Sequence, residues 1–436
     1  MTGREAALQV LQACRREQGW SNAVLKEILS KARLDSRDAA LATRLAYGVL
    51  QNRSLLDYYL QQLLTGKNKL HPLVRDILHL GLYQLKFLDR IPANAAVNES
   101  VSLAKSYCKK QSYAPGLVNA LLRRASTEEL PQPRDLAILY SHPTPLVSLL
   151  RSYVGQDKLE MMLQANNGAP ETVIQVNTRR VTRQQLAELL ADEGVVARPH
   201  SWMESALVLS CSGNLEELKA FQQGLFYVQD PASRLAVECA GIPQGSSWRV
   251  LDCCAAPGGK SFAAAMHLGE NAQLISCDIH PHKQALLENG AGRLGIDILN
   301  ARCRDATQPQ PEWVDAMDLV LCDVPCSGYG IIRKKPDIRF KDPDTMKDLP
   351  VLQLEILLRQ AEFVKPGGRL IYSTCTLVRR ENEGVVEKFL AQRRDFHLVK
   401  LRLPDFFPEN SGMLRLIPGE FDTDGFFIAG LERDHG

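Results

Sequence analysis

The sequence of 436 residues contains no apolar run that approaches the roughly 18 to 20 residues of a membrane-spanning helix. Residues 1–14 also lack the basic, apolar and small-residue succession of a secretion leader. We therefore expect neither a membrane span nor a signal peptide, and no membrane as a partner. The hydrophobic content of 45% and the charged content of 23% are those of an ordinary globular protein of about two to four domains.

The eleven cysteines form no CxxC pair, and the spacing closest to it is that of Cys322 and Cys326. An odd number of cysteines without such pairs argues against a disulfide scaffold and against a structural zinc site. His280 and His282 resemble a metal-binding pair, but no third ligand lies at a suitable spacing, so we expect no metal. Free thiols in a reducing cytoplasm are the better interpretation.

The chain has little net charge, because 52 Lys and Arg face 50 Asp and Glu. That balance hides an asymmetry, since residues 1–130 carry 19 basic and 11 acidic side chains, a net charge of +8. Such a segment is typical of a domain with an anionic partner, but a solvated helical surface would have the same composition. The candidate contacts in this segment are Lys109, Lys110, Arg123 and Arg124.

Three kinds of segment follow one another along the chain. Residues 1–130 show helical spacing of apolar side chains throughout and predict an all-α domain. Two prolines within residues 130–134 begin a predicted helical linker over 131–170. Residues 171–240 then predict strand, helix, two strands, helix and strand, the order of a ferredoxin-like or RNA-recognition-motif module. The aromatic signature of RNA-recognition motifs is absent, so both RNA binding and a simple packing role remain open for this module.

Residues 241–436 predict a doubly wound α/β domain with a parallel sheet. Apolar strands are expected at 249–253, 273–278, 300–304, 319–323 and 369–373. Helices between them are expected at 261–266, 281–294, 348–364 and 381–392. Alternating buried strands and helices indicate this fold class. Two late strands, 396–399 and 426–430, are expected to add to an edge of the sheet.

The first of these strands runs into the glycine-rich segment VLDCCAAPGGK at residues 250–260. It matches neither the dinucleotide fingerprint nor the phosphate-loop motif. Gly258 and Gly259 nevertheless allow a ligand to approach the backbone where a helix begins. Four successive strands are predicted to end in acids, which are Asp252, Asp278, Asp305 and Asp323. Acids at this edge of a sheet indicate a nucleoside site, in which Asp278 would hold a ribose and Asp305 an adenine amino group.

Two cysteines follow strand ends at the same predicted edge. Cys326 comes after Pro325 in the loop beyond the fourth strand, and Cys375 follows the strand at 369–373. A free cysteine is usually a small buried apolar residue. Because both of these are expected beside the nucleoside site, a nucleophilic role is the better hypothesis.

Together these segments resemble the Sun/Nol1/Nop2 family of RNA cytosine-5 methyltransferases over nearly the whole chain. The resemblance includes YVQDPAS at 227–233, DCCAAPGGK at 252–260, DVPCSGYGIIRKKPDI at 323–338, STCTLVRREN at 373–382 and DGFFIA at 424–429. The first domain resembles the NusB RNA-binding domain through VNESVSLAK at 97–105 and LVNALLRR at 117–124. The resemblance implies a Rossmann-like S-adenosylmethionine (SAM)-dependent methyltransferase domain, preceded by the ferredoxin-like module and the NusB-like domain.

The same resemblance implies the ligands of SAM and the catalytic side chains. Those expected to hold SAM are Cys254, Ala255, Ala256, Pro257, Gly258, Gly259, Lys260, Asp278, Asp305 and Asp323. Cys375 is implied as the nucleophile instead of Cys326, because DNA cytosine-5 methyltransferases use the Pro-Cys position and the RNA class uses the second one. Asp323 would contact the ring nitrogen and amino group of cytosine, Lys260 would orient Asp323, and Cys326 would assist product release. Arg379 and Arg380 depart from the Pro-Glu of many members, which changes surface charge more than chemistry.

The implied partner is 16S rRNA, with methylation of the cytosine conventionally numbered 967. Two alternatives remain open: the same chemistry on tRNA or another rRNA site, and a non-catalytic RNA-binding assembly factor. We interpret Arg333, Lys334 and Lys335 as phosphate contacts beside the catalytic site, against the alternative of a solvated run of charge. We expect a monomer without an obligatory protein partner.

Overall fold

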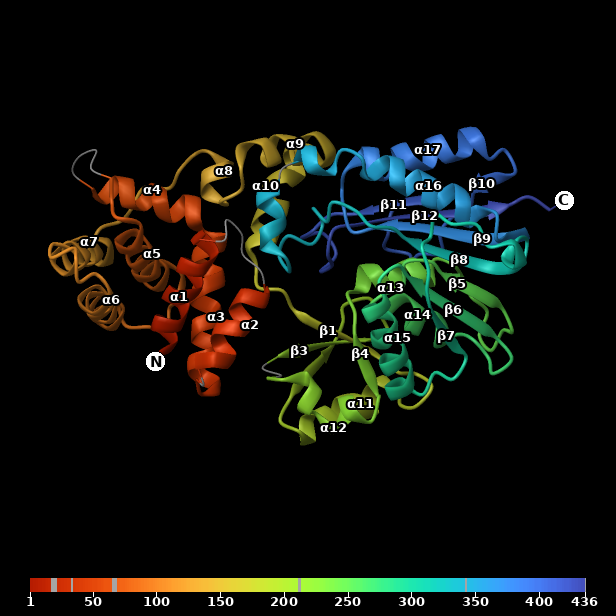
Figure 1. Cartoon of the computed structure of the whole chain (residues 1–436), viewed down its shortest axis with the longest axis horizontal. Coiled ribbons are helices and arrows are strands. Elements are labelled where there is room, and N and C mark those ends of the chain that lie inside the picture. Colours follow the sequence, from red (N-terminus) through yellow and green to blue (C-terminus); the bar gives the residue numbers. More distant parts are fainter. Residues whose placement is uncertain (17–21, 33, 65–68, 211–212, 342, 436) are drawn as a thin grey trace. The chain divides into compact units, whose positions relative to one another are not determined.

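The computed structural model describes residues 1–16, 22–32, 34–64, 69–210, 213–341 and 343–435. The chain divides into two compact units, Met1–Arg151 and Ser152–Gly436. Each unit is described by itself (Figure 1). None of the helices within the described ranges combines the length and the apolar character needed to cross a membrane.

The first unit is helical, as its apolar spacing predicts. Its helices are α1 (Gly3–Arg16), α2 (Asn22–Ala32), α3 (Ser36–Gln51), α4 (Arg53–Leu63), α5 (Pro72–Phe87), α6 (Ala93–Tyr107), α7 (Ala114–Thr127) and α8 (Leu136–Leu139). Local signals set their ends: the Asp35 side chain caps α3, and Pro72 occupies the first turn of α5. One apolar core, which includes Leu8, Leu56 and Ile77, joins α1 to α7.

Helices α9 (Thr144–Val154) and α10 (Gln156–Asn167) lead to the ferredoxin-like module. Its elements are β1 (Thr172–Val176), α11 (Arg183–Asp192), β2 (Val196–Pro199), β3 (Ala206–Ser210), α12 (Lys219–Gln222) and β4 (Phe226–Val228). The strands form an antiparallel sheet in the order β2-β3-β1-β4, so the expected module is confirmed. One face of this sheet packs on α11 and α12, and the other shares the core of the following domain through residues such as Val173 and Tyr227.

The last domain contains the expected parallel sheet. Its strands are β5 (Arg249–Asp252), β6 (Gln273–Asp278), β7 (Leu299–Cys303), β8 (Met317–Asp323), β9 (Val364–Thr374), β10 (Phe396–Leu398), β11 (Met413–Leu416) and β12 (Phe426–Arg433). The order is β10-β12-β9-β8-β5-β6-β7, with β11 paired to β12. The direction of winding reverses between β5 and β8, which is where α/β sheets place their ligands.

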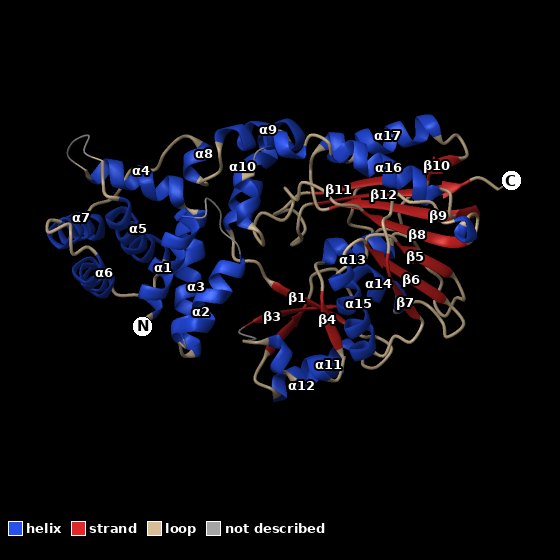
Figure 2. Ribbon diagram, in the orientation of Figure 1, coloured by secondary structure: helices blue, strands red, loops and turns tan. Residues whose placement is uncertain are grey.

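Helices cover both faces of this sheet (Figure 2). One face packs on α13 (Pro231–Glu238), α14 (Gly259–Ala265) and α15 (Pro281–Leu294), and the other on α16 (Leu349–Ala361) and α17 (Glu383–Gln392). Side chains alternate between the two cores along each strand: Leu319 and Leu321 enter the first, while Val320 and Cys322 enter the second. Burial on both faces explains why the strands are continuous apolar runs in the sequence.

The sequence-based expectations were wrong or incomplete in three places. Strand β12 does not extend an edge: it lies antiparallel between β9 and β10, and only β10 is at that edge. Helix α13 and strand β11 were not expected at all. Asp305 lies two residues beyond the end of β7 and does not close that strand.

Candidate active site

Asp323 and Lys260 form an ion pair where β8 ends and α14 begins. The Lys260 Nζ atom donates to Asp323 Oδ2 at 2.7 Å, and Ser373 Oγ of β9 donates to Asp323 Oδ1 at 2.8 Å. Parallel pairing places Asp323 directly opposite Ser373, so the sheet register fixes the second contact. The Lys260 side chain is 9% exposed and that of Asp323 is 31% exposed. The carboxylate therefore receives a donor on each oxygen and still reaches solvent.

Helix α13 supplies a further contact to Lys260. Ser233 Oγ accepts from Lys260 Nζ at 2.8 Å, and Gln229 Nε2 donates to the same hydroxyl at 3.3 Å. The Phe426 ring of β12 lies 5.1 Å from Nζ. Ser233 was not among the expected site residues. The Asp-Pro pair at 230–231 signals the start of a helix and could have placed Ser233 within its first turn.

The two cysteines expected at this edge are brought together. Cys326 Sγ lies 3.3 Å from Cys375 Sγ, and both residues are partly buried. The contact with Cys375, followed by burial, raises the pKa of the Cys326 thiol well above its ordinary value. The Cys326 thiol therefore keeps its proton at neutral pH, and only a thiolate is a strong nucleophile.

The loop that carries Cys326 is held against the end of β9 by backbone and side-chain bonds. Gly330 N donates to the Cys375 carbonyl at 2.9 Å, and Ser327 Oγ lies 2.8 Å from Thr376 Oγ1. A Cβ atom on Gly330 would lie 2.0 Å from the Gly425 carbonyl oxygen, so the close approach requires glycine.

The fully buried Glu381 side chain also holds this loop by hydrogen bonds. Its Oε2 atom accepts from Ser327 N at 2.9 Å and from Gln353 Nε2 at 3.1 Å. Gln353 Nε2 also donates to the Pro325 carbonyl at 2.9 Å. Glu381 and Gln353 therefore hold the loop at the residues on each side of Cys326, Pro325 and Ser327.

The glycine-rich segment turns sharply between β5 and α14. Gly258 has a φ of 116°, and a Cβ atom there would lie 2.4 Å from the Phe262 ring. Ala255 N donates to the Cys277 carbonyl at 2.7 Å, which ties the turn to β6. Since the first N–H groups of a helix have no partner within it, this tight backbone suits a polar ligand. The segment expected to hold SAM therefore fits such a ligand.

The four acids expected at the sheet edge do not share one environment. Asp252 is fully buried and accepts from Ser261 Oγ at 2.7 Å, and burial raises its pKa to about 7. Asp278 is nearly buried and accepts from His280 N at 3.1 Å. Asp305 is partly exposed and accepts from Thr307 N at 2.9 Å. Asp252 therefore acts within the fold, and Asp278 is also buried and pairs with Lys283 at 3.3 Å, while Asp305 and Asp323 are partly exposed.

The basic triplet after the Cys326 loop is largely engaged within the chain. Lys334 Nζ lies 2.7 Å from both Asp230 Oδ2 and Asp424 Oδ2, and Arg333 Nε donates to Asp424 Oδ1 at 2.8 Å. Only Lys335 of the triplet is fully exposed. This pairing weakens the interpretation of Arg333 and Lys334 as phosphate contacts, because their charges are already compensated.

The basic side chains of the first unit that are candidate contacts for an anionic partner differ in their pairing and exposure. Arg124 pairs with Glu128, and its Nε lies 2.9 Å from Glu128 Oε1. Lys109, Lys110 and Arg123 are exposed.

The sheet order, with one antiparallel strand inserted before the edge strand, and the polar groups at its carboxyl edge are those of a Rossmann-like domain with a ligand site where the winding reverses. A family model for the 16S rRNA methyltransferase RsmB/F matches residues 242–432. The NusB family model matches residues 1–127, and a model for the ferredoxin-like domain of RsmF/B-like methyltransferases matches residues 142–216.

Relatives match over almost the full length. The probable ribosomal RNA small subunit methyltransferase B of Bacillus subtilis is 35% identical, over 99% of this chain and 98% of its own. The ribosomal RNA small subunit methyltransferase B of Vibrio cholerae is 34% identical, over 92% and 90%. The chain therefore belongs to the ribosomal RNA small subunit methyltransferase B family, whose members are SAM-dependent rRNA methyltransferases.

Solved structures agree with this assignment. The crystal structure of PH0851 is 25% identical and superimposes with a TM-score of 0.78, over 98% of each chain. NSun6 from Pyrococcus horikoshii, solved with SFG, is 20% identical with a TM-score of 0.60, over 67% of this chain and 99% of its own. The latter likeness shows the fold.

Proposed function

We propose that this protein methylates carbon 5 of a cytosine in 16S rRNA, at the site conventionally numbered 967, through a covalent Cys375–cytosine adduct. The observation that carries the proposal is the placement of the Cys326–Cys375 pair and the Asp323–Lys260 pair at the ends of adjacent strands, β8 and β9. The resemblance to RNA cytosine-5 methyltransferases supports the choice of carbon 5. The names of the relatives support the small-subunit rRNA.

SAM would be held by the turn at 254–260 and by Asp278, Asp305 and Asp323. A tight glycine turn that opens a helix, with the carboxylates of Asp278 and Asp323 at two strand ends and Asp305 just beyond a third, is the chemistry that such a nucleoside with an amino-acid tail requires. NSun6, of the same fold, was solved with SFG, a SAM analogue, which supports this assignment. When bound, SAM supplies an electrophilic methyl group.

The chain's own residues then activate the base. Carbon 5 of cytosine is a weak nucleophile, so the Cys375 thiolate adds to carbon 6 and converts the ring to an enamine that takes the methyl group at carbon 5. Asp323 takes up a proton from solvent, passes it to the ring nitrogen as charge develops there, and returns to the carboxylate form that Lys260 and Ser373 stabilise. The carbon-5 proton then passes to water, the bond between carbon 6 and the Cys375 sulfur breaks to return the thiolate, and the ring nitrogen gives its proton back to the Asp323 carboxylate. Cys326 assists this release.

The target base has to leave its helix to meet Cys375, which favours a single-stranded or loop cytosine. The proposed substrate places the reaction in the cytoplasm. We propose that the helical domain, the linker, the ferredoxin-like module and the methyltransferase domain meet near residues 130, 170 and 240.

Transfer of label from SAM to unmodified 16S rRNA, with nuclease mapping of the labelled base, tests the proposal. We expect label at one cytosine, and bisulfite sequencing should report 5-methylcytosine there. Label on tRNA alone would keep the chemistry and overturn the substrate. Absence of label on both RNAs would favour the non-catalytic assembly role.

A further inference from the structure

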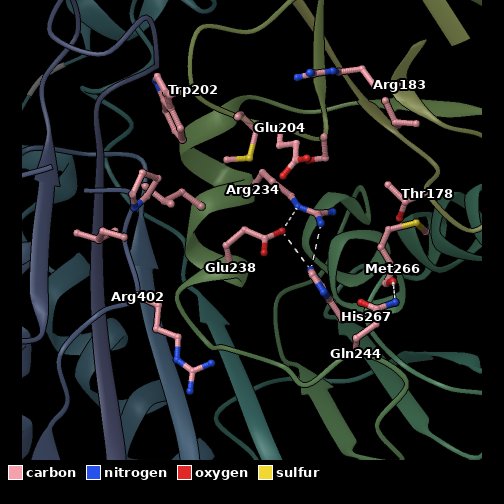
Figure 3. Close-up of a pocket in the computed structure, with 16 residues that line it drawn as sticks. Thr178, Arg183, Trp202, Glu204, Arg234, Glu238, Gln244, Met266, His267 and Arg402 are labelled. Carbon is pink, nitrogen blue, oxygen red and sulfur yellow. Dashed lines mark hydrogen bonds and ion pairs between the residues drawn. The ribbon is translucent and has the colours of Figure 1, made fainter. Parts of the chain in front are cut away.

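A pocket of about 720 Å³ lies where the ferredoxin-like sheet meets the methyltransferase domain (Figure 3). The loop between β2 and β3 contributes Trp202 and Glu204, α13 contributes Arg234 and Glu238, and His267 follows α14. None of the proposed catalytic side chains lines it. Its volume falls within the range of ordinary small-ligand sites, which is roughly 300–1,000 Å³.

The floor of this pocket is a buried and charge-balanced cluster. Arg234 is 2% exposed, and its guanidinium contacts Glu238 and His267 (Figure 3). It also donates to the Tyr227 hydroxyl at 2.9 Å. Burial opposes the ionisation of Glu238, but the bond with His267 and the charge of Arg234 outweigh it and lower its pKa to about 2. Glu238 is therefore an anion whose charge is matched by Arg234. The floor offers fixed polar groups without repelling a phosphate.

The rim of the pocket carries cations that the protein does not neutralise. Within the described part of the chain, no carboxylate forms an ion pair with Arg183 or Arg402, which both line the pocket. Arg183 ends a stretch, residues 177–183, that holds three arginines and no acid. Glu204 is the one lining acid outside the cluster. Guanidinium groups without protein partners are suited to phosphate oxygens.

The wall of the pocket is apolar and rigid. Trp202 Nε1 donates to the Phe421 carbonyl at 2.9 Å, and the indole meets the Phe407 ring edge-on with centroids 5.3 Å apart. Met203, Leu235 and Met266 continue this wall. A fixed indole beside apolar side chains is a surface on which a nucleobase can stack.

We propose that this pocket binds a nucleotide of the RNA substrate other than the target cytosine. Its phosphates lie on Arg183 and Arg402, and its base lies against Trp202 and the apolar wall. Lys260 lies in the first turn of α14 and His267 two residues beyond its end, so the catalytic side chains and the pocket lie at the two ends of this buried helix, and an RNA that contacts both has to extend over the surface between them. The proposal names an anchoring site for the substrate of the proposed function and rests on that substrate being RNA.

Arg183→Ala, Arg402→Ala and the double variant test the anchor. Each single variant is expected to raise KM for RNA and the Kd of an RNA fragment by about five- to tenfold, with kcat within twofold of wild type. The slope of log Kd against log salt is expected to fall by about one for each arginine removed. The double variant Lys388→Ala/Arg394→Ala, which removes two exposed cations elsewhere in the same unit, controls for loss of charge alone.

Photo-crosslinking of RNA that contains 4-thiouridine locates the contact independently. Crosslinked peptides that include Trp202 or Met203 would support the pocket, and their loss in the double arginine variant would tie them to the anchor. Unchanged KM and salt slope, or effects no larger than those of the Lys388/Arg394 control, would overturn it. If the wild-type protein binds RNA but transfers no methyl group, the proposed function is disproved, and the affinity measurements still test the pocket.

Discussion

Lys260 and Asp323 are 63 residues apart in sequence, yet Lys260 Nζ lies 2.7 Å from Asp323 Oδ2. The pair spans α14 and β8, at the point where the sheet reverses its direction of winding. Ser233 and Ser373 each add a hydroxyl, one to the ammonium and one to the carboxylate. An ion pair held from both sides keeps one geometry, which the positioning of a bound cytosine against the carboxylate requires.

Ser233 is expected to position Lys260 for the proposed reaction, because its hydroxyl accepts from Lys260 Nζ at 2.8 Å. Ser233→Ala is expected to lower kcat about tenfold, since the ammonium loses one of its hydrogen-bond acceptors, and to shift the pH profile of the rate. Ser233→Thr, which keeps the hydroxyl, is expected to restore most of the activity. Rates measured from pH 5 to 9 check both variants, with Ser126→Ala at an exposed helix end as control. A Ser233→Ala profile identical to that of wild type would contradict the role.

We expect the two cysteines to take different covalent steps of the proposed mechanism. Cys375→Ala is expected to abolish methyl transfer and adduct formation, because no thiolate is left at that position to add to carbon 6. Cys326→Ala is expected to accumulate a protein–RNA adduct, visible as a retarded band on a denaturing gel. Cys303→Ala, at an exposed cysteine, is the matched control. Activity retained by Cys375→Ala would disprove the assignment of the nucleophile.

Buried Asp252 is expected to make stability depend on pH. Burial raises its pKa to about 7, above the roughly 3.9 of an unfolded chain, so the folded protein holds this proton more tightly. The stability that the protonated form contributes is complete below about pH 4 and is lost as the pH rises through 7.

Asp252→Asn should remove that loss. Relative to the variant, wild type is expected to lose on the order of 2–4 kcal/mol of unfolding free energy between pH 4 and pH 8. Urea denaturation at a series of pH values measures it. A constant difference between the two proteins across this range would show that Asp252 does not titrate there.

The cluster of buried Asp424 with the partly buried Asp230, Arg333 and Lys334 is expected to stabilise the fold more than surface ion pairs do. Lys334→Ala leaves two carboxylates in contact with one cation, and we expect a loss of about 2–4 kcal/mol. Burial and the neighbouring charge of Asp230 already raise the pKa of Asp424 to about 6, although Lys334 and Arg333 lower it, so the ionisation of Asp424 depends on these two cations.

Arg379→Ala removes one partner of the exposed Arg379–Glu387 pair and is expected to cost less than about 1 kcal/mol. Urea unfolding of both variants at pH 7 makes the comparison. Equal losses would mean that the cluster contributes no more than a surface pair.

Much of the architecture could be predicted because its signals are local. Apolar periodicity separates the helical unit from the strands, and the proline and glycine positions mark where elements end. Asp278 and Asp323 end β6 and β8 as expected, because a buried apolar run followed by an acid fixes the end of a strand. Helix α13 was missed although Asp230 and Pro231 carry its N-terminal signal, since eight residues are too few for a clear period.

The tertiary structure alone decided which distant groups meet. Strand β12 enters between β9 and β10, and this brings Phe426 to Lys260 and Asp424 to Lys334. Asp252 ends a strand just as Asp323 does, but it lies fully buried and bonded to Ser261. The sequence thus determined the elements, the turn at Gly258 and the cysteines available for chemistry, because these follow from the conformational and burial preferences of neighbouring residues. The pairing of Cys326 with Cys375, and the compensation of Arg333 and Lys334, depend on strand order and loop packing between segments far apart in the chain, which local patterns do not encode.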